Sequence, residues 1–182
     1  YVGEDSVEAL WSLENAEWED KKELAQHSDA IAHLVANSRA LRVLKLCGMG
    51  KDVASAQQLA KALETNTALQ TLYLNSNQLT DTAGMAMAKA LEMNTALQQL
   101  ELMDNQLTDA AGVALAKALE TNTVLQELWL EGNQLTDTTG VALGKALETN
   151  TALQYLSLKN NQLANTAGVA LAKALETNTA LQ

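Results

Sequence analysis

Hydrophobic positions recur along most of this chain with a period of 28 residues. Units that begin at Leu69, Leu97, Leu125 and Leu153 repeat the pattern LQxLxLxxNQLTDTAGVALAKALETNTA almost without change. Leucines at places one, four and six of each unit have the spacing of a short strand, which should cover about five residues. The GVALAKALE stretch has apolar residues at helical spacing. Each unit is therefore predicted to contain one strand followed by one helix.

The helical half of each unit separates inward from outward positions. In the unit that begins at Leu97, Lys117 and Glu120 should face water. Small residues on the opposite side should let helix and strand approach closely, and Gly144 in the next unit fits such a tight contact. The inward stripe of this helix is expected to consist of Gly112, Leu115, Ala116 and Leu119.

Polar residues mark the turn between strand and helix. Asn at place nine can both donate and accept, so it should satisfy loop backbone groups that stacking would otherwise bury unpaired. Thr and Asp at places twelve and thirteen, as in Thr80 and Asp81, are helix N-cap types, and the acid complements the helix dipole. The asparagines are Asn77, Asn105, Asn133 and Asn161, and the acids are Asp81, Asp109 and Asp137.

The repeat region is predicted to run over residues 41–182, with units beginning at 41, 69, 97, 125 and 153 and a sixth cut off at 181–182. The first unit has Met49 in place of the asparagine and Lys51 in place of a buried leucine. Residues 1–40 are expected to form a mostly helical N-terminal cap, a degenerate repeat with a weak strand between Leu13 and Trp18. In that cap Trp11 and Trp18 should cover the first strand.

The motif LxxLxLxxN, a following leucine and a glycine-containing helix resemble those of leucine-rich repeats. The long helical half is similar to the ribonuclease-inhibitor-like subclass, whose relatives include the repeat domains of NOD-like receptors and tropomodulin. The resemblance implies an α/β solenoid curved as a horseshoe, with a parallel sheet on its concave face and helices on its convex face. Such domains bind proteins or other ligands, usually on the concave face, and have no catalytic chemistry of their own.

Places three, five, seven and eight carry four different residues in the four near-identical units, whereas the exposed lysines and glutamates of the helices do not change. Unrestrained drift of exposed residues is one explanation. Because the helix surface is equally exposed and constant, we favour a diversified binding surface. The candidate ligand-binding residues are Val43, Lys45, Thr71, Tyr73, Asn75, Gln99, Glu101, Met103, Asp104, Glu127, Trp129, Glu131, Tyr155, Ser157 and Lys159.

The chemistry of these residues suits binding. Tyr73, Trp129 and Tyr155 should be exposed on the concave sheet, where aromatic side chains are frequent interface anchors. Acidic residues, among them Glu101 and Glu127, should surround them in the two middle units. The expected partner is a protein or peptide with a neutral to basic surface.

Several classes of function are disfavoured. A net charge of −10 argues against nucleic acid and anionic lipid, and no apolar run is long enough for membrane insertion. His27 and His33 lack neighbours at metal-ligand spacing, and Cys47 sits at a varied place as a passive contact residue. Because no phosphate loop, nucleophile elbow or catalytic carboxylate pair is present, we expect neither enzymatic activity nor a cofactor.

A single cysteine and no N-x-[ST] sequon indicate a cytoplasmic protein, or an extracellular one if a leader has been removed. The chain is expected to be a monomer, with weak end-to-end association through its last unit. The leading hypothesis is a recognition module of an immune-type or self/non-self receptor. The alternatives are a fixed adaptor or cytoskeletal protein-binding domain, and the substrate-recruiting arm of a larger enzyme such as a GTPase or ubiquitin ligase.

Overall fold

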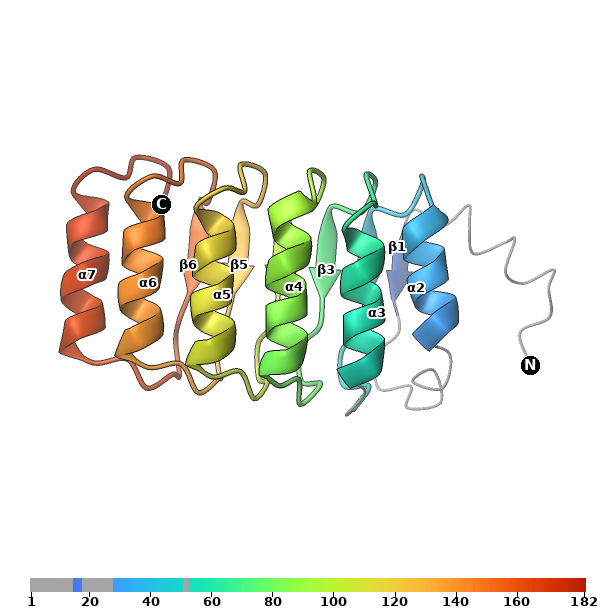
Figure 1. The fold of residues 1–182 in the computed structure, drawn as a ribbon, viewed down its shortest axis with the longest axis horizontal. Coiled ribbons are helices and arrows are strands. Elements are labelled where there is room, and N and C mark those ends of the chain that lie inside the picture. The colour runs from blue at the N-terminus through green and yellow to red at the C-terminus, as the bar shows by residue number, and fades with distance from the viewer. Residues whose placement is uncertain (1–14, 18–27, 51–52) are drawn as a thin grey trace.

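A row of parallel helices packs against one parallel sheet, and both layers follow the order of the chain (Figure 1). The computed structural model describes residues 15–17, 28–50 and 53–182. Each strand pairs with the strand of the next unit, in the order β1-β2-β3-β4-β5-β6. This α/β leucine-rich solenoid is the predicted fold. Trp11, Trp18, His27 and Lys51 lie outside the described residues.

The strands are shorter than expected. Each covers three residues rather than about five, but the inter-strand hydrogen bonds continue beyond them: the amide of Leu74 donates to the carbonyl of Glu101 at 2.9 Å. The first strand lies within the stretch 13–18, where a weak strand was predicted. The strands are β1 (Asn15–Glu17), β2 (Val43–Lys45), β3 (Thr71–Tyr73), β4 (Gln99–Glu101), β5 (Glu127–Trp129) and β6 (Tyr155–Ser157).

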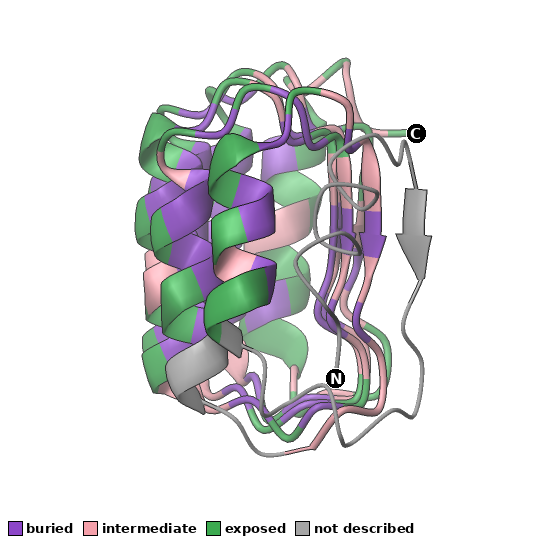
Figure 2. Ribbon diagram, turned by 90° about the vertical axis from the view of Figure 1, so that its right-hand side faces the viewer, coloured by how far each residue is buried: buried purple, intermediate pink, exposed green. Residues whose placement is uncertain are grey.

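Each strand is followed by a helix on the same side of the sheet, as the end-on view shows (Figure 2). The helices are α2 (Ser28–Asn37), α3 (Val53–Leu63), α4 (Asp81–Met93), α5 (Asp109–Leu119), α6 (Asp137–Leu147) and α7 (Asn165–Leu175). The parallel sheet requires this crossover, because consecutive parallel strands cannot be joined by a tight turn.

Leucines from both layers fill the space between sheet and helices. Leu100 and Leu102 of the sheet layer and Leu115 of α5 are completely buried. Gly112, Ala116 and Leu119 are also buried, and Lys117 and Glu120 are exposed, so the predicted inward and outward faces of this helix are confirmed. Figure 2 shows buried positions, in purple, in both the helices and the strands.

The recurrent glycine allows close packing between neighbouring helices, not between helix and strand as the sequence analysis expected. A Cβ atom added at Gly84 would lie 2.5 Å from the Cβ of Ala111, and one at Gly112 would lie 2.2 Å from Oγ1 of Thr139. Gly144 makes a tight contact of the same kind with the backbone of Ala170. The glycines therefore set the spacing of the helix row.

An asparagine ladder holds the turns after β3, β4, β5 and β6, as predicted from place nine. Asn105 is buried, and its side chain donates to the carbonyl of Leu74 at 3.0 Å. Its Oδ1 accepts from the amides of Asn77 at 3.1 Å and Leu79 at 2.9 Å in the preceding unit. Asn133 repeats this arrangement one unit later. Each asparagine thus satisfies backbone groups of its neighbour.

A second asparagine ladder, which the sequence analysis missed, holds the turn between each helix and the next strand. Asn122 at place twenty-six donates to the carbonyl of Leu91 at 2.7 Å and accepts from the amide of Leu125 at 2.8 Å. The same pattern is found at Asn66, Asn94, Asn150 and Asn178. Side-chain amides therefore hold the turns at both ends of β3, β4, β5 and β6 against the preceding unit.

The acids at place thirteen cap a helix, but it is the helix of the next unit. Asp109 accepts from the amides of Thr136 at 2.9 Å and Thr139 at 3.2 Å, at the start of α6. Asp81 and Asp137 do the same for α5 and α7. The cap therefore joins neighbouring repeats, a role that the pattern within a single repeat does not predict.

Ion pairs between units involve several of the constant lysines and glutamates on the exposed helix surface. Lys145 lies 3.2 Å from Glu120, and Lys173 lies 2.9 Å from Glu148; each pair joins one unit to the next. Exposed pairs of this kind stabilise a protein by about 0 to 1 kcal/mol each. Because these four side chains have structural partners, their constancy is a weaker contrast to the variation on the sheet than the sequence analysis assumed.

The outer side of the last helix lacks a covering unit in this chain. Val169 is 71% exposed and Leu175 is 50% exposed, although their counterparts in earlier units are better covered. End-to-end association through this surface stays a prediction.

Replacing Asn105 tests the first ladder. Asn105→Ala removes the partners of buried backbone groups in two units, and each unsatisfied group costs about 1 to 3 kcal/mol. We expect the free energy of unfolding, measured by chemical denaturation, to fall by at least about 2 kcal/mol. Gln106→Ala changes the exposed neighbouring side chain and should have almost no effect. Equal losses in both variants would contradict the role given to the ladder.

Acidification tests the inter-repeat cap at Asp109. Burial raises its pKa, but hydrogen bonds from Thr136 and Thr139 to the ionised carboxylate outweigh this and hold the pKa below its ordinary value of 3.8. Because the folded state has the lower pKa, the stabilisation is present above about pH 4 and is lost as pH falls through the folded pKa. The stability difference between the native protein and Asp109→Asn should therefore shrink in acid. A difference that stays constant from neutral pH to pH 2 would contradict this role.

Candidate functional site

Strand register places the varied residues in continuous rows on the exposed face of the sheet, which we call the concave face. The row of place three is Val43, Thr71, Gln99, Glu127 and Tyr155. The row of place five is Lys45, Tyr73, Glu101, Trp129 and Ser157. Backbone hydrogen bonds join the turns that carry place seven, which holds Cys47, Asn75, Met103, Glu131 and Lys159. Residues separated by 28 positions in sequence are thus neighbours in space.

Most of these side chains are partly or fully exposed, including the three aromatic residues, and Tyr155 is 40% exposed. Glu101 and Ser157 contradict the expectation of exposure, because each is only 8% exposed. Ser157 is a small residue beside the large side chain of Trp129 in the same row. Glu101 lies between Tyr73 and Trp129, which are its register neighbours on the two adjoining strands.

Two amide side chains hold the buried carboxylate of Glu101. Asn75 donates to Oε2 at 2.7 Å, and Gln99 donates to Oε1 at 2.8 Å. Asn75 also accepts from the amide of Met103 at 3.0 Å, which fixes it between two turns. Glu101 therefore anchors a small polar network on the concave face and is not a freely exposed ligand contact.

An aromatic pair and a carboxylate form the neighbouring part of the face. The ring centroids of Trp129 and Tyr155 are 4.2 Å apart, and their planes meet at 30°. The indole Nε1–H of Trp129 donates to Oε2 of Glu127 at 3.1 Å. These contacts orient both rings and one carboxylate on the surface before any partner arrives.

A cation lies over the other aromatic residue of the same row. The Nζ atom of Lys45 is 5.3 Å from the ring centroid of Tyr73. Burial raises the pKa of the Tyr73 hydroxyl, the charge of Glu101 raises it further, and Lys45 opposes this rise. The row therefore alternates in character from cation to ring to acid to ring.

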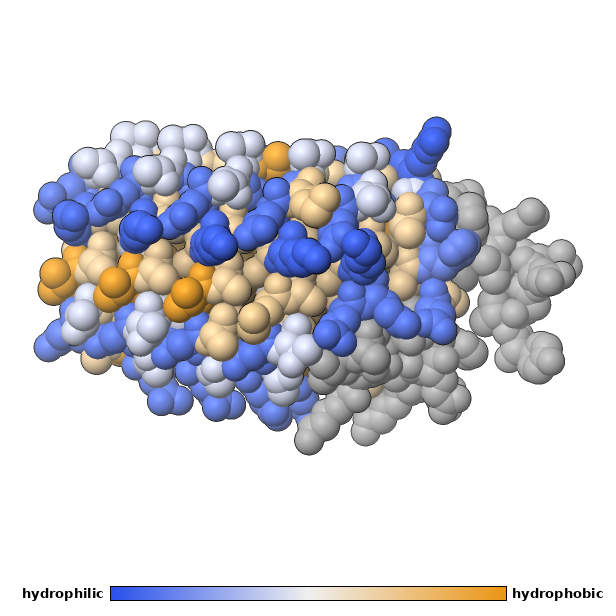
Figure 3. All heavy atoms as spheres, viewed as in Figure 1, coloured by the Kyte–Doolittle hydropathy of each residue, from blue (hydrophilic) through white to orange (hydrophobic). Residues whose placement is uncertain are grey.

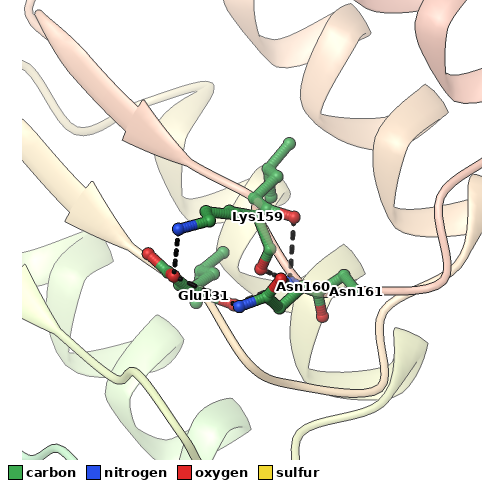
Figure 4. Close-up of polar contacts among 6 residues, drawn as sticks. Glu131, Lys159, Asn160 and Asn161 are labelled. Carbon is green, nitrogen blue, oxygen red and sulfur yellow. Dashed lines mark hydrogen bonds and ion pairs between the residues drawn. The ribbon is translucent and has the colours of Figure 1, made fainter.

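The edge of the concave face carries a second charge cluster, drawn in Figure 4. Lys159 lies 3.5 Å from Oε1 of Glu131, and the Asn160 amide donates to the same oxygen at 3.4 Å. The charge of Glu131 is therefore compensated within the chain. Asp104, the candidate at place eight, is exposed on the adjoining turn.

Place eight is less free than the sequence comparison indicated. Its residues in the five units all have positive φ, between 52° and 69°. Glycine, asparagine and aspartate tolerate this left-handed conformation best, which limits the choice of side chain. The residues at this place are Gly48, Ser76, Asp104, Gly132 and Asn160. The predominance of glycine, asparagine and aspartate there was the sequence signal of this constraint.

The helical face offers a different surface. A hydrophobic band crosses it between hydrophilic side chains (Figure 3). Exposed Met85, Val113, Val141 and Val169 occupy equivalent positions in four units. A groove of about 340 Å³ lies between α5 and α6, lined by Val113, Ala116, Lys117, Glu120, Ala142 and Lys145. Lys145 and Glu120 pair with each other, whereas Lys117 makes no ion pair among the described residues, so the lining of the groove keeps one positive charge.

No group of histidine, cysteine or acidic residues in the described part of the chain is arranged to hold a metal ion, and His33 contacts Asn37 on its own helix. None of the described helices is long and apolar enough to span a membrane.

The parallel strands, the helix row and the asparagine ladders define a leucine-rich repeat protein. A family model described as "TMOD/LMOD Leucine-rich domain" matches residues 84–182, more than half of the chain, and one described as "Leucine Rich repeat" matches residues 65–88. The chain therefore belongs to the TMOD/LMOD leucine-rich domain family. A search of curated proteins found no match.

Two solved structures share the fold. One is titled "Leiomodin-1 Actin-Binding Site 2 (ABS2)", with 20% identity, a TM-score of 0.55, and coverage of 85% of this chain and 87% of the other. The second is a tropomodulin C-terminal domain from Caenorhabditis elegans, with 15% identity, a TM-score of 0.54, and coverage of 94% and 92%. Similarity to tropomodulin repeat domains is thus confirmed, whereas membership of the ribonuclease-inhibitor-like subclass stays a prediction.

Replacing Glu101 tests its place in the polar network. Glu101→Ala leaves Asn75 and Gln99 without their acceptor, and loss of such contacts costs about 1 to 3 kcal/mol. We expect the free energy of unfolding to fall by about 1 to 2 kcal/mol. Glu92→Ala, on the exposed side of α4, is the matched control and should change it by less than about 0.5 kcal/mol. If thermal melts of the two variants coincided, Glu101 would be a surface residue after all.

Proposed function

We propose that this chain is a non-enzymatic protein-binding domain of the cytoskeletal kind, with its partner on the concave face. The observation that carries the proposal is the oriented Trp129–Tyr155 pair beside Glu127. Aromatic side chains at such positions are frequent binding anchors, each contributing about 2 kcal/mol or more. The candidate residues named from the sequence remain the proposed contacts, with Glu101 and Ser157 acting from beneath the surface.

The comparisons guide the choice of partner. One structural neighbour is named as an actin-binding site, and the family is shared with leiomodin and tropomodulin domains. We therefore propose actin as the first partner to test, and the cytoplasm as the compartment. This choice replaces the immune-type receptor, which the sequence analysis placed first, by the cytoskeletal alternative.

A diversified receptor surface remains the second candidate because of one observation. Places three, five and seven still carry a different residue in each near-identical unit. The ion pairs on the helices weaken the contrast on which that hypothesis depended. Related genes of the same genome would separate the two: many copies that differ at these places favour diversification, and one fixed set favours an adaptor.

Co-sedimentation with filamentous actin tests the proposal. Trp129→Ala should weaken binding about 30-fold, the effect of losing an anchor worth about 2 kcal/mol. Lys117→Ala, which changes the groove on the helical face, should bind like the native protein. Circular dichroism of both variants checks that they fold. A loss at Lys117 with none at Trp129 would move the site to the helical face, and no binding by the native protein would exclude actin.

A further inference from the structure

The carboxylates of Glu101 and Glu127 lie beside the aromatic pair. Glu131 pairs with Lys159, and on the helix face Glu120 pairs with Lys145 and Glu148 pairs with Lys173. Among the described residues, Glu101 and Glu127 make no ion pair, although Glu101 is buried next to Trp129 in the register. The Trp129–Tyr155 pair thus lies against two carboxylates with no cation between them.

In the same row, another aromatic ring already has a cation over it. Lys45 lies over the ring of Tyr73, on the other side of Glu101. A cation over an aromatic ring is attracted by the negative face of the ring, and a nearby carboxylate adds to this attraction. No described cation of the chain lies over Trp129 or Tyr155. Within the described residues, Lys45 supplies the cation at Tyr73, and the Trp129–Tyr155 pair has none.

The geometry favours a planar cation. Trp129 and Tyr155 stack on each other with their centroids 4.2 Å apart, so a flat group can contact the outer face of either ring but cannot enter between them. Oε2 of Glu127 accepts the hydrogen bond from the Trp129 indole, which leaves Oε1 as a further acceptor near the rings. A guanidinium group can stack on an aromatic face while its N–H groups donate to a carboxylate, whereas an ammonium group acts as a point charge.

We propose that Trp129, Tyr155 and Glu127 bind an arginine side chain presented by the protein partner. The inference rests on the proposed protein-binding function and names the chemical group that the concave face recognises. The guanidinium stacks on an outer face of the aromatic pair and donates to Glu127, and the buried charge of Glu101 strengthens the attraction. Charge complementarity of this kind contributes to partner choice and to the association rate.

The direct test uses N-acetyl-arginine amide as the probe and the full chain labelled with nitrogen-15. The indole signal of Trp129, assigned with Trp129→Phe, should shift in a saturable manner, while those of Trp11 and Trp18 serve as internal references. N-acetyl-citrulline amide has nearly the same shape without the charge. It should bind at least about fivefold more weakly, because it loses the charge-assisted contact.

Glu127→Gln keeps the shape of the site and removes its charge. It should weaken arginine binding by about fivefold or more, whereas Glu92→Gln on the helical face should leave it unchanged. Equal affinities for the arginine and citrulline probes would overturn the inference, and so would equal shifts of all three indole signals. Full affinity in Glu127→Gln would do the same.

Actin co-sedimentation run in parallel separates the two proposals. If Trp129→Ala abolishes actin binding but the arginine probe causes no shift, the proposed function stands and the arginine inference fails. If the probe binds at Trp129 and actin does not sediment with the chain, the arginine site stands and the partner must be another protein.

Discussion

Hydrogen bonds from asparagine side chains to buried backbone hold this solenoid together. Stacking repeats buries the turns on both sides of every strand, and a buried backbone group without a partner costs about 1 to 3 kcal/mol. Asn105 bonds backbone groups of its own and the preceding unit. Asn122 bonds backbone groups of its own unit and of the units before and after it. The aspartate caps and the glycine contacts add further links between adjacent helices. Every strong polar link thus joins nearest neighbours, as expected for a repeat protein.

The hydrogen bonds between neighbouring units also determine how side chains are arranged on the concave face. Because the ladders fix each turn against the last, side chains at equivalent places form straight rows, and chemistry can be combined across units that are distant in sequence. Trp129 and Tyr155 meet in this way, and so do Lys45 and Tyr73. The surface is nevertheless not independent of the framework, since Glu101 is buried in a polar network and place eight requires positive φ.

The sequence predicted the repeat fold, the inward face of the helices and the first asparagine ladder, because each follows from periodicity within one unit. The predictions from sequence failed for features that depend on a contact between units. The target of Asp109, the neighbour of Gly112 and the second ladder at Asn122 all lie across a repeat boundary. Glu101 was assigned to the surface from strand alternation alone, which does not include shielding by the larger side chains of Tyr73 and Trp129.

Amide hydrogen exchange in Asn133→Ala tests most directly whether the ladders couple neighbouring repeats one at a time. In the native protein the Leu107 amide donates to Asn133 at 3.0 Å, and the amides of Leu79 and Leu135 donate to the asparagines of other units. Loss of Asn133 should therefore speed exchange at Leu107 while Leu79 and Leu135 keep their protection. Unchanged protection at Leu107, or an equal loss at all three amides, would contradict the account.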